Sequence, residues 1–177
     1  MLDSVSVESV RIPLQALAGS GCWPVYDYWH RLRGGRPAPT WSEFDLWNLP
    51  ADAIRYTHVV DVREDPFDLV YRFWGTGMTD VLQFERTGKS LLSTSMGYLN
   101  EARRQQVLAD YREVIETRRP LPFLWNAATA RESTRRLIVP SLRLPFCADG
   151  ERVTQILTNF DFVGTREVWE AMFTRRD

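Results

Sequence analysis

The pattern of apolar and polar positions predicts a first helix between Pro24 and Gly34. Proline fits the first turn of a helix, where its missing N–H has no partner to lose, and glycine fits the left-handed residue that ends one. The apolar face of this helix consists of Val25, Tyr28, Trp29 and Leu32. Further on, Thr40 and Glu43 have the spacing of a capping box, which predicts a short helical turn through Phe44.

Two strands and two helices are expected in the middle of the chain. Residues 57–62 are rich in β-branched side chains and end in an acidic turn, and residues 69–74 are aromatic and β-branched up to Gly75. Met78, Val81 and Leu82 indicate a short helix. A long helix over residues 101–118 is ended by Pro120. Its apolar stripe consists of Val107, Leu108, Tyr111, Val114 and Ile115.

Three more strands are expected after the long helix. Residues 121–130 form a broad aromatic strand, and apolar residues alternate over residues 138–144, where two prolines indicate an edge-like or bulged strand. A hairpin turn at residues 148–150 leads to the last strand, residues 153–162. An amphipathic terminal helix is expected to close the chain. Its apolar face consists of Val168, Trp169, Met172 and Phe173.

This element order predicts an α+β fold. A two-stranded hairpin, a helical crossover and three further strands favour an antiparallel sheet with helices on one face, and the strand–helix alternation of a parallel sheet is missing. Residues 1–22 are interpreted as a weakly structured N-terminal extension, and residues 23–177 as a single domain with flanking helices.

Composition narrows the function classes. The net charge of −1 provides no basic excess for phosphate backbones, so nucleic acid is not an expected partner. Cys22 and Cys147 are too few and too far apart for a disulfide framework or a zinc site. The first residues lack the features of a signal peptide, and no apolar run approaches the roughly 18 residues of a membrane span. We therefore expect a cytoplasmic protein that does not associate with a membrane.

Several short motifs follow one another over about residues 26–160. In chain order they are Tyr28-Trp29, LRGGRP at 32–37, Phe44-Asp45, Leu49-Pro50, Asp61-Val62, YRFWGT at 71–76, TGKSL at 87–91, Leu144-Pro145-Phe146 and Asp149-Gly150. Together they resemble the motifs of a family of small stand-alone bacterial PAS-domain proteins. This chain departs from the family pattern at residues 46–48, and at Trp74, where a smaller residue is usual.

The resemblance implies a PAS-like five-stranded antiparallel sheet cupped over small helices, with N- and C-terminal helices added. In PAS domains generally, the space between sheet and helices holds a cofactor or metabolite, or is filled by side chains. The Trp74 ring would fill part of that space. No catalytic residue and no identified cofactor is carried over. The ligand-binding residues expected here are Phe73, Trp74, Met78, Leu82, Phe84, Tyr111, Phe123, Trp125 and Leu142.

Other residues that bear reactive or charged groups form no complete motif. His30 and His58 lack a second metal ligand at fixed spacing, so both are interpreted as ordinary polar residues, His58 at a strand edge. Residues 75–77 (GTG) lack the third glycine of a dinucleotide fingerprint and are read as a turn. Two further charged groups are interpreted as solvated turns. They are the acidic group of Glu64, Asp65 and Asp68, and the basic group of Arg131, Arg135 and Arg136.

These features favour a PAS-type sensory or protein-interaction module in bacterial signalling, which binds a small ligand or a partner without turnover. A homodimer or a signalling protein is the expected macromolecular partner, and the terminal helix packs on its own sheet or on a second protomer. Two alternatives stay open. One is a small-molecule enzyme on a cupped, isomerase-like α+β fold, which needs a buried Asp or His facing the cavity. The other is an adaptor with a filled core.

Overall fold

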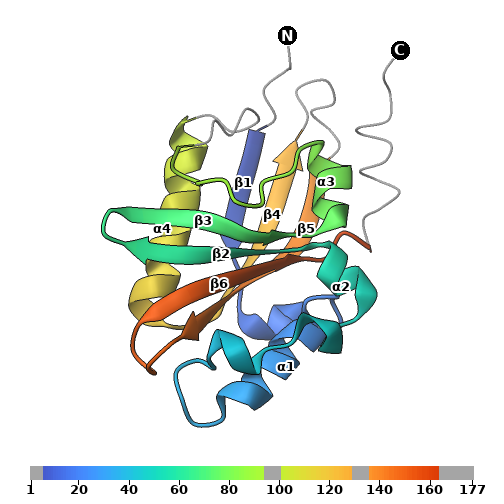
Figure 1. Ribbon diagram of the computed structural model, residues 1–177. Helices are drawn as coiled ribbons and strands as arrows, with labels where there is room; N and C mark the ends of the chain where they lie inside the picture. Colours follow the sequence, from blue (N-terminus) through green and yellow to red (C-terminus); the bar gives the residue numbers. More distant parts are fainter. Residues whose placement is uncertain (1–5, 94–100, 129–135, 164–177) are drawn as a thin grey trace.

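All strands that the structure describes belong to one antiparallel sheet, in the order β1-β4-β5-β6-β2-β3 (Figure 1). The computed structural model describes residues 6–93, 101–128 and 136–163. The strands are β1 (Ser6–Arg11), β2 (Thr57–Glu64), β3 (Phe67–Trp74), β4 (Leu121–Ala128), β5 (Arg136–Cys147) and β6 (Val153–Phe160). The hairpin β2–β3 comes first after the N-terminal helix, the helices follow, and β4, β5 and β6 form a meander whose last strand returns to pair with β2. The predicted α+β antiparallel sheet is confirmed.

The sheet has six strands, one more than predicted. β1 pairs with β4 along its whole length, from Ser6 opposite Ala128 to Arg11 opposite Phe123. It lies inside the segment that we interpreted as a weakly structured extension. The sequence SVESVR carries few large apolar residues, because an edge strand leaves part of its surface in solvent: Val10 is 51% exposed. Such a strand gives only a weak alternation signal.

In the described part of the chain, four helices and three short 3₁₀ turns surround the sheet. The helices are α1 (Trp23–Arg33), α2 (Ala51–Arg55), α3 (Thr76–Leu82) and α4 (Glu101–Thr117), and the turns are Leu14–Leu17, Trp41–Glu43 and Leu46–Asn48. Within the turn at residues 41–43, the carboxylate of Glu43 accepts a hydrogen bond from the Thr40 N–H at 2.7 Å, as the capping-box spacing predicts. No helix in the described ranges is both long and apolar enough to cross a membrane.

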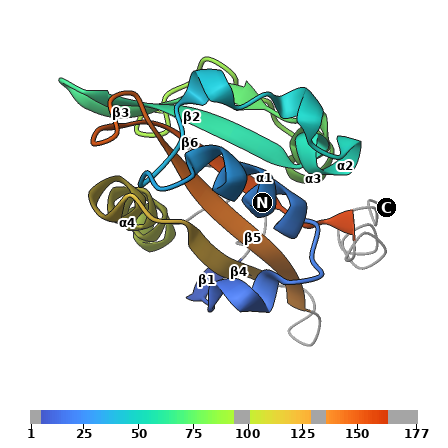
Figure 2. The same cartoon turned by 90° about the horizontal axis from the view of Figure 1, so that it is seen from below.

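Helices cover both faces of the sheet, because α4 and α1 pack on opposite sides of β5 (Figure 2). Arg143 of β5 reaches Asp110 of α4, whereas Phe146, which points the other way, contacts Trp41 and Phe44 in the segment that follows α1. The indole N–H of Trp29 in α1 donates to the carbonyl of Pro145 at 2.8 Å. The PAS resemblance implies a ligand, or filling side chains, between sheet and helices, and the region under α4 is one such place.

The two prolines of β5 do not place it at an edge, because β5 lies between β4 and β6. The expected bulge is present, between Phe146 and Cys147. Pro145 lies beyond Leu121, where β4 begins, so its missing N–H removes no ladder bond on that side. Pro140 lies where β6 ends, and its carbonyl accepts from the N–H of Asp161 at 2.9 Å. Pro140 and Pro145 are tolerated in this central strand because each of them lies where a neighbouring strand ends.

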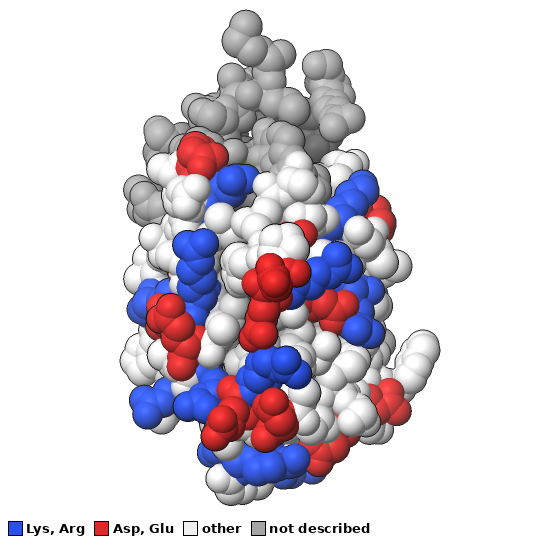
Figure 3. All heavy atoms as spheres, turned by 60° about the vertical axis from the view of Figure 1, so that its left-hand side comes forward, with Lys and Arg blue, Asp and Glu red and all other residues white. Residues whose placement is uncertain are grey.

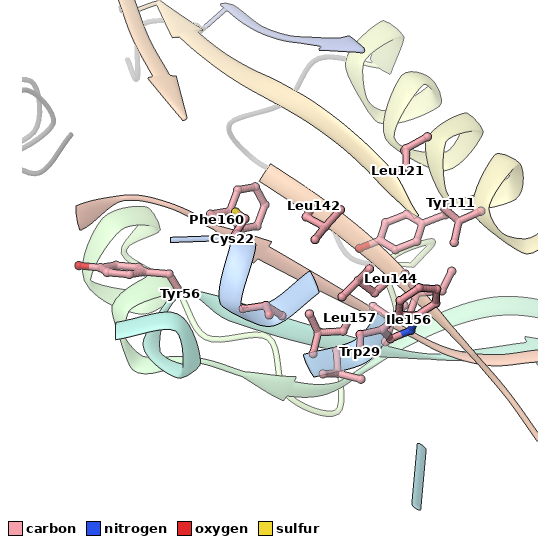
Figure 4. Packing of buried hydrophobic residues seen from close by; sticks show 14 of the residues in the cluster. Cys22, Trp29, Tyr56, Tyr111, Leu121, Leu142, Leu144, Ile156, Leu157 and Phe160 are labelled. Carbon is pink, nitrogen blue, oxygen red and sulfur yellow. The ribbon is translucent and has the colours of Figure 1, made fainter. Parts of the chain in front are cut away.

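Both faces of the sheet contribute to the hydrophobic core (Figure 4). Tyr111 and Trp29 reach the sheet from α4 and α1 and are each 1% exposed. The surface shown in Figure 3 carries Arg and Lys side chains interspersed with Asp and Glu, in keeping with the net charge of −1. The expected terminal helix, together with Arg131 and Arg135, lies outside the described residues.

Candidate functional site

A group of buried polar side chains lies between α4 and the sheet. We call it the polar core cluster. Its members are His58 (β2), Trp74 (β3), Arg86 (the segment after α3), Asp110 and Tyr111 (α4), Arg143 (β5) and Thr158 (β6). Each is at most 7% exposed. Buried polar groups destabilise a fold unless their hydrogen bonds and charges are satisfied, so their partners indicate what this region can do.

His58 links β2 to α4. Its Nε2 lies 2.8 Å from the hydroxyl of Tyr111, and the imidazole stacks on the Trp74 ring at a centroid distance of 5.4 Å and an interplanar angle of 11°. Burial, together with the charges of Arg143 and Arg86, lowers the pKa of His58 to about 3. The imidazole is therefore neutral, and its Nδ1 is buried without a partner. The interpretation of His58 as a polar residue at a strand edge is wrong, because β2 lies between β6 and β3.

Asp110 is a fully buried carboxylate that is saturated by donors. It accepts from Arg11 at 2.9 Å and from Arg143 at 3.2 Å. Gln106 and Ser9 donate to it as well, at 2.8 and 3.3 Å. Sequence reasoning missed this residue, although a signal was present: Asp110 falls on the apolar stripe of α4, where an acid is expected to have a buried partner.

Arg143 is the buried partner of Asp110. Its guanidinium lies over the rings of Tyr111 and Phe123, at 4.8 and 4.4 Å from the ring centroids. Cation–π contacts of this kind hold the planar group between α4 and the sheet. The Arg143 Nε is nevertheless buried without a hydrogen-bond partner, so one donor of this side chain is unused.

Arg86 is a buried cation without a counter-charge among the described residues. It is 3% exposed, and its guanidinium lies 4.5 Å from the Phe84 centroid and 5.8 Å from that of Tyr71. Its Nε and Nη1 are buried and have no hydrogen-bond partner. A cation removed from water without an anion is strongly destabilising, so this arrangement needs an explanation. The sequence carried no signal for it.

The polar core cluster therefore has a surplus of positive charge and of hydrogen-bond donors. The cluster holds two guanidiniums, of Arg86 and Arg143, and one carboxylate, of Asp110, and the neutral His58 adds no charge. A further donor, the indole N–H of Trp74, is buried without a partner. Phe84 contacts both Trp74 and Arg86: its ring centroid lies 5.7 Å from that of Trp74, and the Arg86 guanidinium lies over its ring. Groups of this chemistry suit an anionic molecule rich in acceptors.

The structure brings most of the expected ligand-binding residues to this region. Trp74, Tyr111, Phe123 and Trp125 lie on the sheet face under α4 or on α4 itself. Met78 and Leu82 belong to α3, and Phe84 contacts Trp74. Strand alternation puts Phe73 and Leu142 on the sheet face that points away from α4. There Phe73 lies opposite Val59 of β2, and Leu142 lies on the same side of β5 as Leu144. These two residues do not reach the polar core cluster.

The glycines at 75 and 77 are required by close packing and not by an anion. Gly75 has an ordinary φ of −65°, and a Cβ there would lie 2.2 Å from the Arg55 carbonyl oxygen. A Cβ on Gly77 would lie 2.5 Å from the Tyr56 ring. The interpretation of this segment as a strand-to-helix turn agrees with the structure, but the reason for glycine is the closeness of α2.

The other candidates have ordinary structural surroundings. His30 is exposed on α1, where its Nδ1 accepts from the Arg33 Nε at 3.2 Å. In the acidic group, Asp68 accepts from the Ser90 hydroxyl at 2.7 Å, and Glu64 lies 4.0 Å from Arg152. Both cysteines are buried and free. Within the described ranges, no three His, Cys, Asp or Glu side chains come together in a metal-binding group.

The strand pairing decides the fold class. A hairpin, a helical crossover through α3 and α4, and a three-stranded meander that returns to the first strand form the sheet that the resemblance implies. The α+β antiparallel sheet that the element order predicts is therefore the fold of this chain over the described residues.

Comparison with known proteins finds no matching family model and no matching curated protein. Among solved structures, an RNA-binding light-oxygen-voltage receptor matches with a TM-score of 0.44 and 10% identity, over 98% of this chain and 46% of that one. A fungal LOV-domain photoreceptor matches with a TM-score of 0.42 and 14% identity, over 83% of this chain and 96% of that one. No residue role, cofactor or partner is transferred from either protein.

Proposed function

We propose that this PAS-like chain is a sensory or partner-binding module in bacterial signalling, and that it binds a small anionic ligand at the polar core cluster without turnover. The observation that supports this proposal is the buried guanidinium of Arg86, which has no carboxylate partner among the described residues. An anion bound beside it would supply the missing charge and would accept from donors that are otherwise unused.

The chemistry of the cluster favours binding over catalysis. A general base needs a pKa near the working pH, whereas the pKa of His58 is lowered to about 3. The buried carboxylate of Asp110 is held by two arginines and not by an imidazole, and His58 contacts a tyrosine hydroxyl. A buried Asp and a buried His, which the enzyme alternative needs, are both present, but no hydrogen bond joins Asp110 to His58 among the described residues, so the two do not form an acid–base pair.

A ligand at this place has a route to the rest of the fold. Arg86 begins a segment that pairs with β3, where the N–H of Tyr71 donates to Lys89 and the N–H of Leu91 donates to Leu69. An anion that repositions Arg86 would therefore act on the strand at the edge of the sheet. Signalling would then be a population shift between two packings of the elements around the cluster, in a cytoplasmic homodimer or in a complex with a signalling protein.

The test combines identification of a ligand with one substitution. Native mass spectrometry of the purified chain looks for a retained small molecule, and calorimetry measures binding of carboxylates and phosphate. Arg86→Met is expected to bind the anion at least tenfold more weakly than the wild type does. Arg72→Met is the matched control, since Arg72 is exposed and paired with Asp61 at 2.7 Å. If no anion binds, or if it binds equally well to Arg86→Met, the proposal fails.

A further inference from the structure

A second recessed region lies away from the polar core cluster, where α4 ends and β4 begins. It is a pocket of about 490 Å³, within the size range of small-molecule sites. Its walls come from three parts of the chain: the first 3₁₀ turn, α1 with the loop after it, and residues 117–120. Figure 2 shows the loop after α1 approaching the end of α4.

One wall of this pocket is aromatic and held in place. Trp29 is 1% exposed, and its indole N–H donates to the Pro145 carbonyl at 2.8 Å, which fixes the ring. Tyr26 is half-buried one helical turn earlier, with its ring at 6.2 Å and 29° from that of Trp29. Trp29 is too deeply buried to contact a ligand itself, but it supports the ring of Tyr26, which offers a flat apolar surface at the pocket at little cost in side-chain entropy.

Three arginines line the same pocket. They are Arg33 of α1, and Arg118 and Arg119 of the turn into β4. None of them has a carboxylate within salt-bridge distance in the part of the chain described here, whereas the neighbouring Arg31 and Arg36 pair with Asp27 and Glu43. The Arg33 guanidinium lies 5.7 Å from the Trp29 ring centroid and donates to the Arg36 carbonyl.

The backbone of this turn is unusual at Arg118. Its φ of 55° lies in the left-handed region, which is unfavourable for a residue with a Cβ. The conformation reverses the chain at the end of α4 and presents two consecutive arginines at the pocket. A left-handed residue is a common way to end a helix, so the conformation itself is explained by the end of α4, where the Arg118 N–H donates to the Val114 carbonyl at 2.9 Å.

From these observations we infer that the pocket binds a small anion that carries a flat ring, such as an aromatic carboxylate or a nucleoside monophosphate. The ring packs against Tyr26, and the carboxylate or phosphate accepts hydrogen bonds from the guanidiniums of Arg118 and Arg119. The site is separate from the polar core cluster and does not depend on the function proposed for that cluster.

The probes are indole-3-carboxylate and adenosine monophosphate, with indole and adenosine as their uncharged counterparts and inorganic phosphate as the anion without a ring. Calorimetry on the full chain is expected to show binding of at least one charged ring compound, at least tenfold tighter than its uncharged counterpart and than phosphate. Binding of neither charged probe, or equal binding of charged and uncharged forms, would overturn the inference.

Three variants locate the binding. Arg118→Ala combined with Arg119→Ala is expected to weaken binding at least tenfold. Arg31→Ala is the control, because Arg31 of α1 is paired with Asp27 and does not line the pocket, and it is expected to leave binding unchanged. Arg86→Met separates the two sites: the ring compound should bind this variant as it binds the wild type. Loss of binding in Arg86→Met with retention in the Arg118/Arg119 variant assigns the ligand to the polar core cluster and overturns the inference. Thermal unfolding of each variant verifies that it is folded.

Discussion

The imidazole Nε2 of His58 and the hydroxyl of Tyr111 lie 2.8 Å apart across the interface between β2 and α4. The two residues are 53 positions apart in sequence, and the contact ties the crossover helix to β2, the neighbour of the edge strand β3. The Tyr111 hydroxyl also lies 3.5 Å from the hydroxyl of Thr158, so β6 joins the same group. This contact keeps one nitrogen of a neutral imidazole satisfied in a region where two guanidiniums disfavour a second proton.

The first prediction concerns the pH dependence of stability. The unfolded chain binds a proton on His58 near its ordinary pKa of about 6.5, whereas the folded chain binds it only near 3. Between these values the unfolded state holds more protons, so the free energy of unfolding falls as the pH falls. His58 should remove about 1.4 kcal/mol between pH 7.5 and 5.5. Urea unfolding at these two pH values measures the loss.

The matched variants for this prediction are His58→Gln and His30→Gln. His58→Gln removes the titrating group and should flatten the dependence over this range, although it lowers the stability at both pH values. His30 is exposed on α1, so His30→Gln is expected to leave the pH dependence of the wild type unchanged. A wild-type free energy of unfolding that does not change between pH 7.5 and 5.5 would contradict the neutral, buried state of His58.

The second prediction concerns Asp110. Replacing it with alanine leaves the guanidinium of Arg143 buried without a counter-charge, and breaking a buried pair in this way costs about 3–5 kcal/mol. Glu113→Ala is the control, because Glu113 is a half-exposed partner of Arg11 on the same helix, and its loss should cost less than about 1 kcal/mol. Chemical denaturation compares the two. Similar losses in both variants would mean that Asp110 contributes no more than a surface pair.

Apolar periodicity predicted most elements of this fold. Five strands, α1, α3 and α4 occur where it indicated them, because each buries one regular face, and the turn at residues 41–43 occurs where the capping-box spacing indicated it. Two predictions failed because they depend on the neighbours of a strand in the sheet. β1 was missed because an edge strand needs few apolar positions. β5 was placed at an edge because of its prolines, whereas these prolines lie where the neighbouring strands end, which local sequence does not reveal.

The candidate site was less predictable than the fold. The aromatic residues of the region, such as Trp74 and Tyr111, were identified because large rings are usually buried. Arg86 and Arg143 were missed, since arginine is usually exposed and nothing in the neighbouring residues distinguishes a buried one. Asp110 was within reach of sequence reasoning through its place on the apolar stripe of α4. The burial of an arginine depends on partners far away in sequence, so local sequence does not reveal it.

The third prediction uses the close approach of α2 to Gly75. A Cβ at Gly75 would lie 2.2 Å from the Arg55 carbonyl oxygen and 2.7 Å from that of Ile54, so Gly75→Ala must move backbone and should cost about 3 kcal/mol. Gly35→Ala is the control, because a Cβ there meets nothing within 4 Å, and its effect should stay below about 1 kcal/mol. Thermal unfolding distinguishes them, and equal melting temperatures would show that α2 yields without cost.

The last prediction is that Arg86→Met stabilises the ligand-free chain. The substitution removes a buried cation that has no carboxylate partner among the described residues and replaces it with an apolar side chain of similar length. Relieving two buried, unpaired donors should raise the free energy of unfolding by about 1–3 kcal/mol, even after the contact with the Phe84 ring is lost. Denaturant unfolding without added anions measures the gain, and Arg72→Met, which breaks an exposed pair with Asp61, should give no gain. A destabilised Arg86→Met would mean that the guanidinium already has adequate partners, and the argument for an anion at the polar core cluster would lose its basis.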